Sequence, residues 1–134
     1  MPILVREALT ARGPILELGC GDYSTPVLAA IAAHLGVPFS FMSSSQEWAE
    51  KYPGGRIVDW ETVVFPQADV VFLDNEERTR DRIKHLPALA KTSRVVVMHD
   101  ISACIARPAF AGLVAGFANF CAYPEHNTGV AWRN

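Results

Sequence analysis

The residues best suited to chemistry are those at positions 17–21, E-L-G-C-G, which close a short apolar run and precede a helix. The apolar run 15–18 is typical of a buried strand. Thr25 followed by Pro26 predicts an N-cap and a proline at the first helical position. The glycines in between let the backbone turn sharply and let a ligand approach without meeting a Cβ atom. A strand, a glycine turn and a helix N-terminus together predict a site for a nucleotide-like ligand.

Acids and one histidine follow the predicted strands, at the sheet edge where ligands gather in α/β proteins. They are Asp22, Asp59 and Asp74 after the first, third and fourth strands, and His99 and Asp100 after the fifth. We expect neighbouring strand ends to bring Asp74 and Asp100 within a few ångströms of each other. His99 is the candidate general base, because imidazole titrates near neutral pH. The alternative is structural, with His99 as a packed group and with Asn75 and Asp100 as helix caps.

The strands and helices that must position these groups alternate along the chain. Strands are predicted at 15–18, 38–42, 56–60, 68–73, 94–98, 117–123 and 128–132, and helices at 3–11, 25–35, 44–51, after residue 75 and at 103–116. Pro87 must kink or shorten the fourth helix. The wholly apolar strands 68–73 and 94–98 are typical of strands covered on both faces. We therefore predict one α/β domain over 1–134, with a doubly wound, mostly parallel Rossmann-like sheet and a C-terminal antiparallel hairpin.

The stretch E-L-G-C-G-x-x-S-T resembles the first motif of class I S-adenosylmethionine-dependent methyltransferases. In that family the acid and the glycine turn hold the cofactor, which implies this role for Glu17, Gly19, Cys20 and Gly21. The phrases V-V-V-M-H-D at 95–100 and T-G-V-A-W at 128–132 resemble later strands of small-molecule methyltransferases. The resemblance runs from about residue 15 to about residue 133 and implies a seven-stranded sheet whose last strand is reversed.

The resemblance also implies further cofactor contacts, each with a structural alternative. Ser43 stands where relatives carry an acid for both ribose hydroxyls, and a serine cannot form that charge-assisted pair; it can equally be a turn or capping residue. Asp59 and Trp60 match a loop that faces the adenine in relatives. The alternative is a surface aspartate and a tryptophan packed under a loop. Asp74 is also counted among the cofactor-binding residues.

Magnesium-dependent members of that family place metal-binding acids after the fourth and fifth strands, which implies Asp74 and Asp100 as metal ligands. Hard oxygen ligands suit Mg²⁺, whereas imidazole suits it less. His99 and Asp100 are the expected catalytic residues. We therefore expect S-adenosylmethionine as the cofactor, and Mg²⁺ as a further candidate.

Composition excludes several other classes. The net charge of −2 over 134 residues gives no electrostatic case for nucleic-acid binding. The apolar runs are far shorter than the roughly 20 residues of a membrane span, so no membrane partner is expected. The three cysteines form an odd set without a C-x-x-C pair, which indicates reduced thiols and a cytoplasmic location. Cys20 has no histidine beside it in sequence, which argues against a catalytic thiol.

Other charged residues are expected to be solvated and without a role. These are His34, His85, His126, Arg78, Arg80, Arg82 and Lys84.

The expected function is methyl transfer from S-adenosylmethionine to a small-molecule acceptor, at oxygen. An alternative is a methyltransferase-like binding or assembly module without catalysis, whose apolar helix 103–116 another subunit would cover, as in a homo-oligomer. A third hypothesis is a nicotinamide-dependent oxidoreductase. It is disfavoured because Ser24 replaces the third glycine of G-x-G-x-x-G and no acid ends the second strand.

Overall fold

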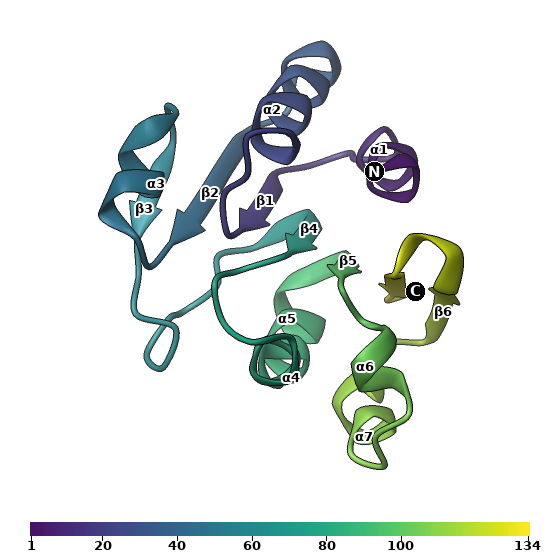
Figure 1. The fold of residues 1–134 in the computed structure, drawn as a ribbon. Helices are drawn as coiled ribbons and strands as arrows, with labels where there is room; N and C mark the ends of the chain where they lie inside the picture. The colour runs from purple at the N-terminus through teal and green to yellow at the C-terminus, as the bar shows by residue number, and fades with distance from the viewer.

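A seven-stranded mixed sheet runs through the middle of the molecule (Figure 1), with the strand order β3-β2-β1-β4-β5-β7-β6. The structure is a computed structural model that describes residues 1–134, apart from the side chain of Thr79. The strands are β1 (Ile15–Leu18), β2 (Phe39–Ser43), β3 (Gly55–Ile57), β4 (Ala68–Leu73), β5 (Ser93–His99), β6 (Asn119–Tyr123) and β7 (Thr128–Trp132). The helices are α1 (Pro2–Ala8), α2 (Ser24–Leu35), α3 (Gln46–Lys51), α4 (Thr79–Arg82), α5 (Leu86–Thr92), α6 (Ser102–Ile105) and α7 (Phe110–Val114), with 3₁₀ turns η1 (Ile83–His85) and η2 (Pro124–His126).

The sheet is mostly parallel. Strands β1 to β5 pair in parallel, whereas β7 pairs antiparallel with both β5 and β6. The expected α/β class and the C-terminal antiparallel hairpin are thus confirmed. Because β2 and β4 flank β1 on opposite sides, the chain direction across the sheet reverses beside the end of β1, which is where ligands bind in open α/β sheets.

Both faces of the sheet are covered, as the continuous apolar strands predict. Alternate side chains of β4 enter two separate cores: Val71 and Leu73 belong to one, and Val70 and Phe72 to the other. Helices α1 and α2 close the second core, and α5 and α7 close the first, so the helices lie in two layers (Figure 1). The site is therefore built on strand ends that are held rigidly from both sides.

The predicted strands at 15–18, 68–73 and 128–132 match β1, β4 and β7 in both bounds. Two helices begin at other residues than predicted: α2 has its N-cap at Tyr23, two residues before Thr25, and α3 begins at Gln46 instead of 44. Helix α2 begins at Ser24 after Tyr23, so Thr25 lies in its first turn instead of at the N-cap. Helix α3 is capped by Ser45, whose side chain accepts from the Trp48 N–H. Tyr23 makes no capping hydrogen bond with its side chain, whereas Ser45 does.

Two predicted helices are each divided in the structure. The segment that contains Pro87 forms α4, η1 and α5, with the proline in the first turn of α5, where its missing N–H costs no bond. The apolar stretch 103–116 forms the short helices α6 and α7 with Pro108 between them, because proline disfavours helix in the residue before it. Neither Asn75 nor Asp100 caps a helix; Arg78 precedes α4 and Ile101 precedes α6.

Candidate functional site

The glycine turn after β1 is fixed by a buried carboxyl group. Glu17 is 1 % exposed and accepts hydrogen bonds from Ser24 Oγ at 2.5 Å and Thr25 Oγ1 at 2.6 Å. Thr25 Oγ1 also accepts from the Gly21 N–H at 3.0 Å, and it lies 3.3 Å from the Cys20 sulfur. Burial raises the pKa of Glu17 to about 7. Glu17 therefore ties the strand to the first turn of α2, and its carboxyl faces hydroxyls of the protein.

Gly19 is required by the protein's own backbone. Its φ is +110°, and a Cβ atom there would lie 2.3 Å from the Asp74 carbonyl oxygen and 3.0 Å from the Asn75 Cα. The loop after β4 thus crosses directly over the glycine turn. A side chain at position 19 would push β4 away from β1, so substitution disturbs the fold before it tests any ligand.

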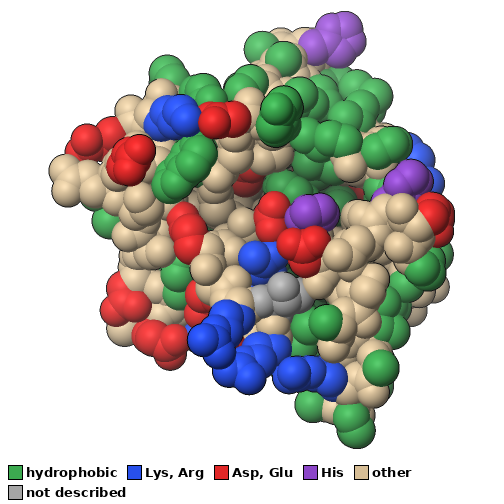
Figure 2. All heavy atoms as spheres, viewed as in Figure 1, with side chains coloured by type: hydrophobic (Ala, Val, Ile, Leu, Met, Phe, Trp, Pro, Cys, Tyr) green, Lys and Arg blue, Asp and Glu red, His purple; other side chains and the backbone are tan. Residues whose placement is uncertain are grey.

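A cavity of about 320 Å³ opens beside this turn. Its lining residues come from the N-terminus and α1, the glycine turn and the start of α2, β4 and the residue after it, β5 and β7: Met1, Leu4, Gly21, Asp22, Tyr23, Ser24, Phe72, Asp74, Val97, His99 and Thr128. Figure 2 shows acidic side chains around a histidine next to a recessed apolar area in the middle of this face. The volume is in the range of small-molecule sites, roughly 300–1,000 Å³.

Asp74, His99 and Asp100 meet at this edge of the sheet, as predicted, and Asp74 and His99 line the cavity. Ligand atoms of Asp74, His99 and Asp100 all lie within 4.8 Å of one another. His99 Nδ1 is 3.3 Å from Asp74 Oδ2 and 3.5 Å from Asp100 Oδ2, which are ion-pair distances. The neighbouring Asp74 carboxylate raises the pKa of His99. The ring is thus a stronger base than an isolated imidazole.

Arg82, which was expected to be solvated, is 8 % exposed and completes this cluster. Its Nη1 lies 2.5 Å from Asp74 Oδ1, and its Nη2 donates to the Asn75 carbonyl oxygen at 2.7 Å. Nothing in the sequence distinguishes Arg82 from the neighbouring basic residues, which are exposed. The interaction balances the charge of Asp74 and fixes the loop after β4.

Asn127 is the second residue that the sequence interpretation missed. Its Nδ2 donates to Asp100 Oδ1 at 2.9 Å, and its Oδ1 accepts from the Ser102 N–H at 2.9 Å. Both Asp100 and Asn127 have positive φ, +57° and +47°. Aspartate and asparagine are the non-glycine residues that best tolerate this conformation. An asparagine directly before a strand is the signal that would have pointed to such a turn.

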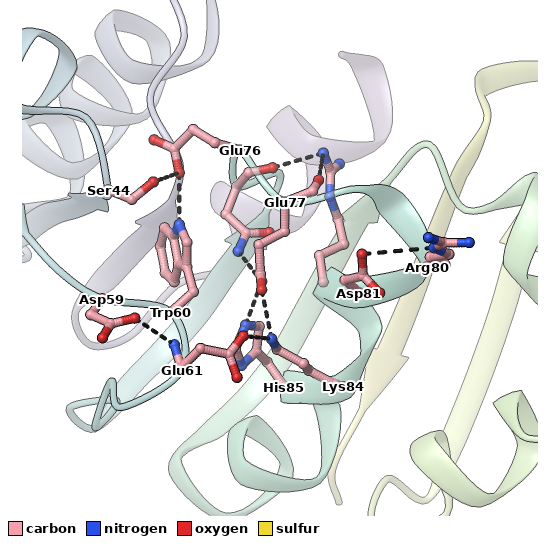
Figure 3. Close-up of polar contacts among 12 residues, drawn as sticks. Ser44, Asp59, Trp60, Glu61, Glu76, Glu77, Arg80, Asp81, Lys84 and His85 are labelled. Atoms are coloured by element: carbon pink, nitrogen blue, oxygen red, sulfur yellow. Dashed lines mark hydrogen bonds and ion pairs between the residues drawn. The ribbon is translucent and has the colours of Figure 1, made fainter.

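A network of ion pairs connects the loop after β4 to η1 (Figure 3). Glu77 accepts from Lys84 Nζ and lies against His85 Nε2, each at 2.7 Å. The expectation that His85 is solvated is wrong: it is 6 % exposed and packs edge-on against Phe65. Burial opposes ionisation of Glu77, but the surrounding donors, Lys84 first, hold its pKa below the ordinary value. These contacts tie the loop that carries Asp74 to η1.

The implied adenine and ribose contacts lie outside the cavity lining. Asp59 is exposed and accepts from the Glu61 N–H at 3.0 Å in the turn after β3. Trp60 is 7 % exposed in the core, which corresponds to the packed alternative. Ser43 is 0 % exposed at the end of β2. Of the proposed cofactor residues, Gly21 and Asp74 line the cavity.

The donor set suits Mg²⁺ poorly. One oxygen of Asp74 is paired with a guanidinium group, and an imidazole stands between the two carboxylates. A hard cation prefers oxygen ligands and a net negative site. The guanidinium group of Arg82 already balances one of the two carboxylates. The cluster is thus better suited to holding a proton on His99 than to holding Mg²⁺.

A scan against protein-family models matches no family, and a search of curated proteins finds no significant relative. Within residues 1–134, none of the helices combines the length and the apolar character that crossing a membrane requires.

Proposed function

We propose that this chain is an S-adenosylmethionine-dependent methyltransferase that acts on a small molecule, at oxygen. One observation carries the proposal: the glycine turn and a histidine flanked by carboxylates line the same cavity. The sheet supports the proposal as well. Its seven strands, with the last one antiparallel to its neighbours, match the sheet that the motif resemblance implies. The Rossmann-like character of the sheet is part of the same proposal.

In this function one side of the cavity holds the cofactor and the other side holds the acceptor. Gly21 and Ser24, at the start of α2, form the cofactor side, while His99 and Thr128 form the acceptor side. S-adenosylmethionine, when bound, supplies a reactive methyl group, so the protein must mainly align the partners and exclude water. The apolar side chains of Leu4 and Phe72 serve that exclusion.

His99 acts as the general base. Its Nδ1 faces Asp74 and Asp100, so Nε2 is the atom that would take the proton of the acceptor hydroxyl as that oxygen receives the methyl group and the bond from the methyl group to the sulfonium sulfur breaks. The two carboxylates orient the ring and stabilise the imidazolium that results. Asp100 is in turn held by Asn127. Because the pKa of His99 is raised, activity should increase with pH as the ring loses its proton.

Calorimetric titration of the purified chain with S-adenosylhomocysteine, beside NAD, tests the proposal. Micromolar binding of S-adenosylhomocysteine alone is expected, and an acceptor screen with Mg²⁺ and with EDTA then follows. His99→Gln should keep that binding and lose turnover. Binding of NAD alone would support an oxidoreductase, and binding of neither ligand would refute the proposal.

A second candidate is a methyltransferase-like module without catalysis. The end of β2 favours this candidate. The Ser43 hydroxyl there is already hydrogen-bonded to Glu76 and to the Ser45 N–H, so it is not free for a cofactor. This candidate predicts no cofactor binding and a homo-oligomer or other partner that covers α6 and α7, which light scattering after size exclusion would detect. The three free thiols fit a reducing compartment, so a cytoplasmic location belongs to both candidates.

A further inference from the structure

The two edges of the sheet differ in how they are protected (Figure 1). Strand β3, at one edge, has three residues and carries the exposed Arg56. Strand β6, at the other edge, has five residues, and the segment 117–123, F-A-N-F-C-A-Y, contains neither a charged residue nor a proline. Charges, prolines and short strands are means of preventing an edge strand from pairing with another chain. The middle of β6 has no charge or proline for this purpose.

The hydrogen bonds of β7 show which backbone groups of β6 face outward. The N–H of Arg133 donates to a carbonyl oxygen of β5 at 2.8 Å, so the backbone of Arg133 faces β5. Because this direction alternates along an antiparallel strand, Val130 faces β6, where its register partner is Cys121. The N–H and C=O groups of Phe120 and Ala122, on either side of Cys121, therefore point away from the sheet.

Both ends of this free edge are closed. At the start of β6 the Ala118 N–H donates to the Trp132 carbonyl oxygen at 2.8 Å, although the register partner of Trp132 is Asn119. Two residues of β6 thus oppose one of β7, which is a β-bulge, and a bulge ends regular pairing. At the other end, Pro124 lacks the N–H that a further ladder bond needs. An added strand is therefore confined to the segment 120–123.

This segment is complementary to itself. In an antiparallel ladder, the two residues of a hydrogen-bonded pair exchange both of their N–H···O bonds. If a second copy lies on a two-fold axis through Cys121, Phe120 of each copy is opposite Ala122 of the other. Each of these two pairs then satisfies all of its outward N–H and C=O groups. Because the segment carries no charge, two identical edges meet without repulsion.

We propose that β6 is a homodimer interface, in which two copies pair antiparallel about Cys121 and join their sheets into one. This surface is different from the surface of α6 and α7 in the second candidate function, and the inference does not depend on a cofactor. The pairing segment is short, so the contact belongs to the small, transient interfaces and the dimer should dissociate on dilution.

The register makes a further structural demand on Cys121, whose thiol is free and partly exposed. The two Cys121 residues form a non-hydrogen-bonded pair, in which Cα atoms are about 4.5 Å apart and both side chains lie on the same face. Disulfides form across Cα separations of about 4.4–6.8 Å. The two thiols should therefore be close enough to be joined by an added oxidant.

Sedimentation velocity of the reduced chain tests the pairing, at concentrations from about 1 to 500 µM, where small interfaces dissociate. The wild type should shift from monomer toward dimer as the concentration rises. Ala122→Pro should remain a monomer with an unchanged circular dichroism spectrum, because the proline removes an N–H that makes no ladder bond within one copy. Ala122→Ser keeps this N–H and should dimerise like the wild type.

Disulfide cross-linking tests the register. A chain with Cys20→Ser and Cys104→Ala keeps Cys121 as its only thiol, and diamide, which takes up both thiol hydrogens, should join two copies through it. The matched control replaces all three cysteines and carries Ala103→Cys, an exposed position on α6. Paired thiols meet at an effective concentration of about 1 mM, so at about 100 µM chain the Cys121 thiol should cross-link about tenfold faster than the control.

A chain that stays monomeric at every concentration overturns the proposal. A dimer that persists in folded Ala122→Pro overturns it as well, because the contact then lies elsewhere on the molecule. Should Ala122→Pro fail to fold, the cross-linking rates decide. A faster reaction at Cys121 supports the pairing of β6, whereas an equal or faster reaction in the Ala103→Cys control contradicts it and indicates the surface of α6 and α7.

Discussion

Replacing the buried carboxyl group of Glu17 by an amide should remove a pH dependence of folding stability around neutral pH. Glu17 is 1 % exposed, and burial raises its pKa from 4.5 to about 7. The folded protein therefore holds this proton more tightly than the unfolded chain does. The stabilising contribution is complete below about pH 4.5 and is lost as the pH rises through about 7.

The magnitude follows from the two pKa values. Their difference corresponds to about 3 kcal/mol, at about 1.4 kcal/mol for each pH unit. In a chain of 134 residues this amounts to a decrease of roughly 10 °C in the melting temperature. Glutamine keeps one oxygen to accept from the Ser24 hydroxyl, its amide N–H can donate to Thr25 Oγ1, and it has no proton to lose. Glu17→Gln should therefore equal the wild type near pH 5 and be about 2–3 kcal/mol more stable at pH 8.5.

Urea denaturation followed by circular dichroism, at several pH values from 5 to 9, measures this difference. Subtracting the variant from the wild type removes the contribution of all other titrating groups. Glu47→Gln, an exposed carboxylate, serves as the control and should follow the wild-type curve. If the curves of Glu17→Gln and the wild type stay parallel across this range, the carboxyl does not hold its proton near neutral pH and the burial argument is refuted.

Three further predictions concern the cavity and the loops around it. Asp74→Asn should lower the His99 pKa toward its ordinary 6.5, as read from imidazole shifts in an NMR titration; an unchanged value would contradict the contact. Because the pKa of His99 is raised in the folded state, its contribution to the folding stability of the wild type should be present below about pH 6.5. That contribution should be lost as the pH rises through the raised pKa. Arg82→Met should cost about 3 kcal/mol in urea denaturation, because it leaves Asp74 without its partner; Arg80→Met, at an exposed site, should change stability by less than about 0.5 kcal/mol. Asn127→Gly should lose about 1–3 kcal/mol with its two hydrogen bonds, and Asn127→Ala should lose about 1 kcal/mol more because of its positive φ; equal melting temperatures for the two variants would contradict that strain.

The sequence by itself determined the strands and the edge at which their polar residues meet. The apolar runs of β1 and β4 are local patterns, and the glycine turn is a local backbone requirement, so both could be predicted without knowing any partner. The meeting of Asp74 with His99 and Asp100 followed from parallel pairing, because parallel strands end at one edge of a sheet.

Only the tertiary structure decided which partner each polar side chain finds. Arg82 has the same charge as its exposed neighbours, yet it alone of Arg78, Arg80 and Arg82 is buried, because the loop after β4 folds back onto it. Glu76 meets Ser43 because the strand order carries one loop over another. Hydrophobic periodicity reports which face of an element is buried, but contacts between residues distant in the chain depend on how the strands are ordered across the sheet.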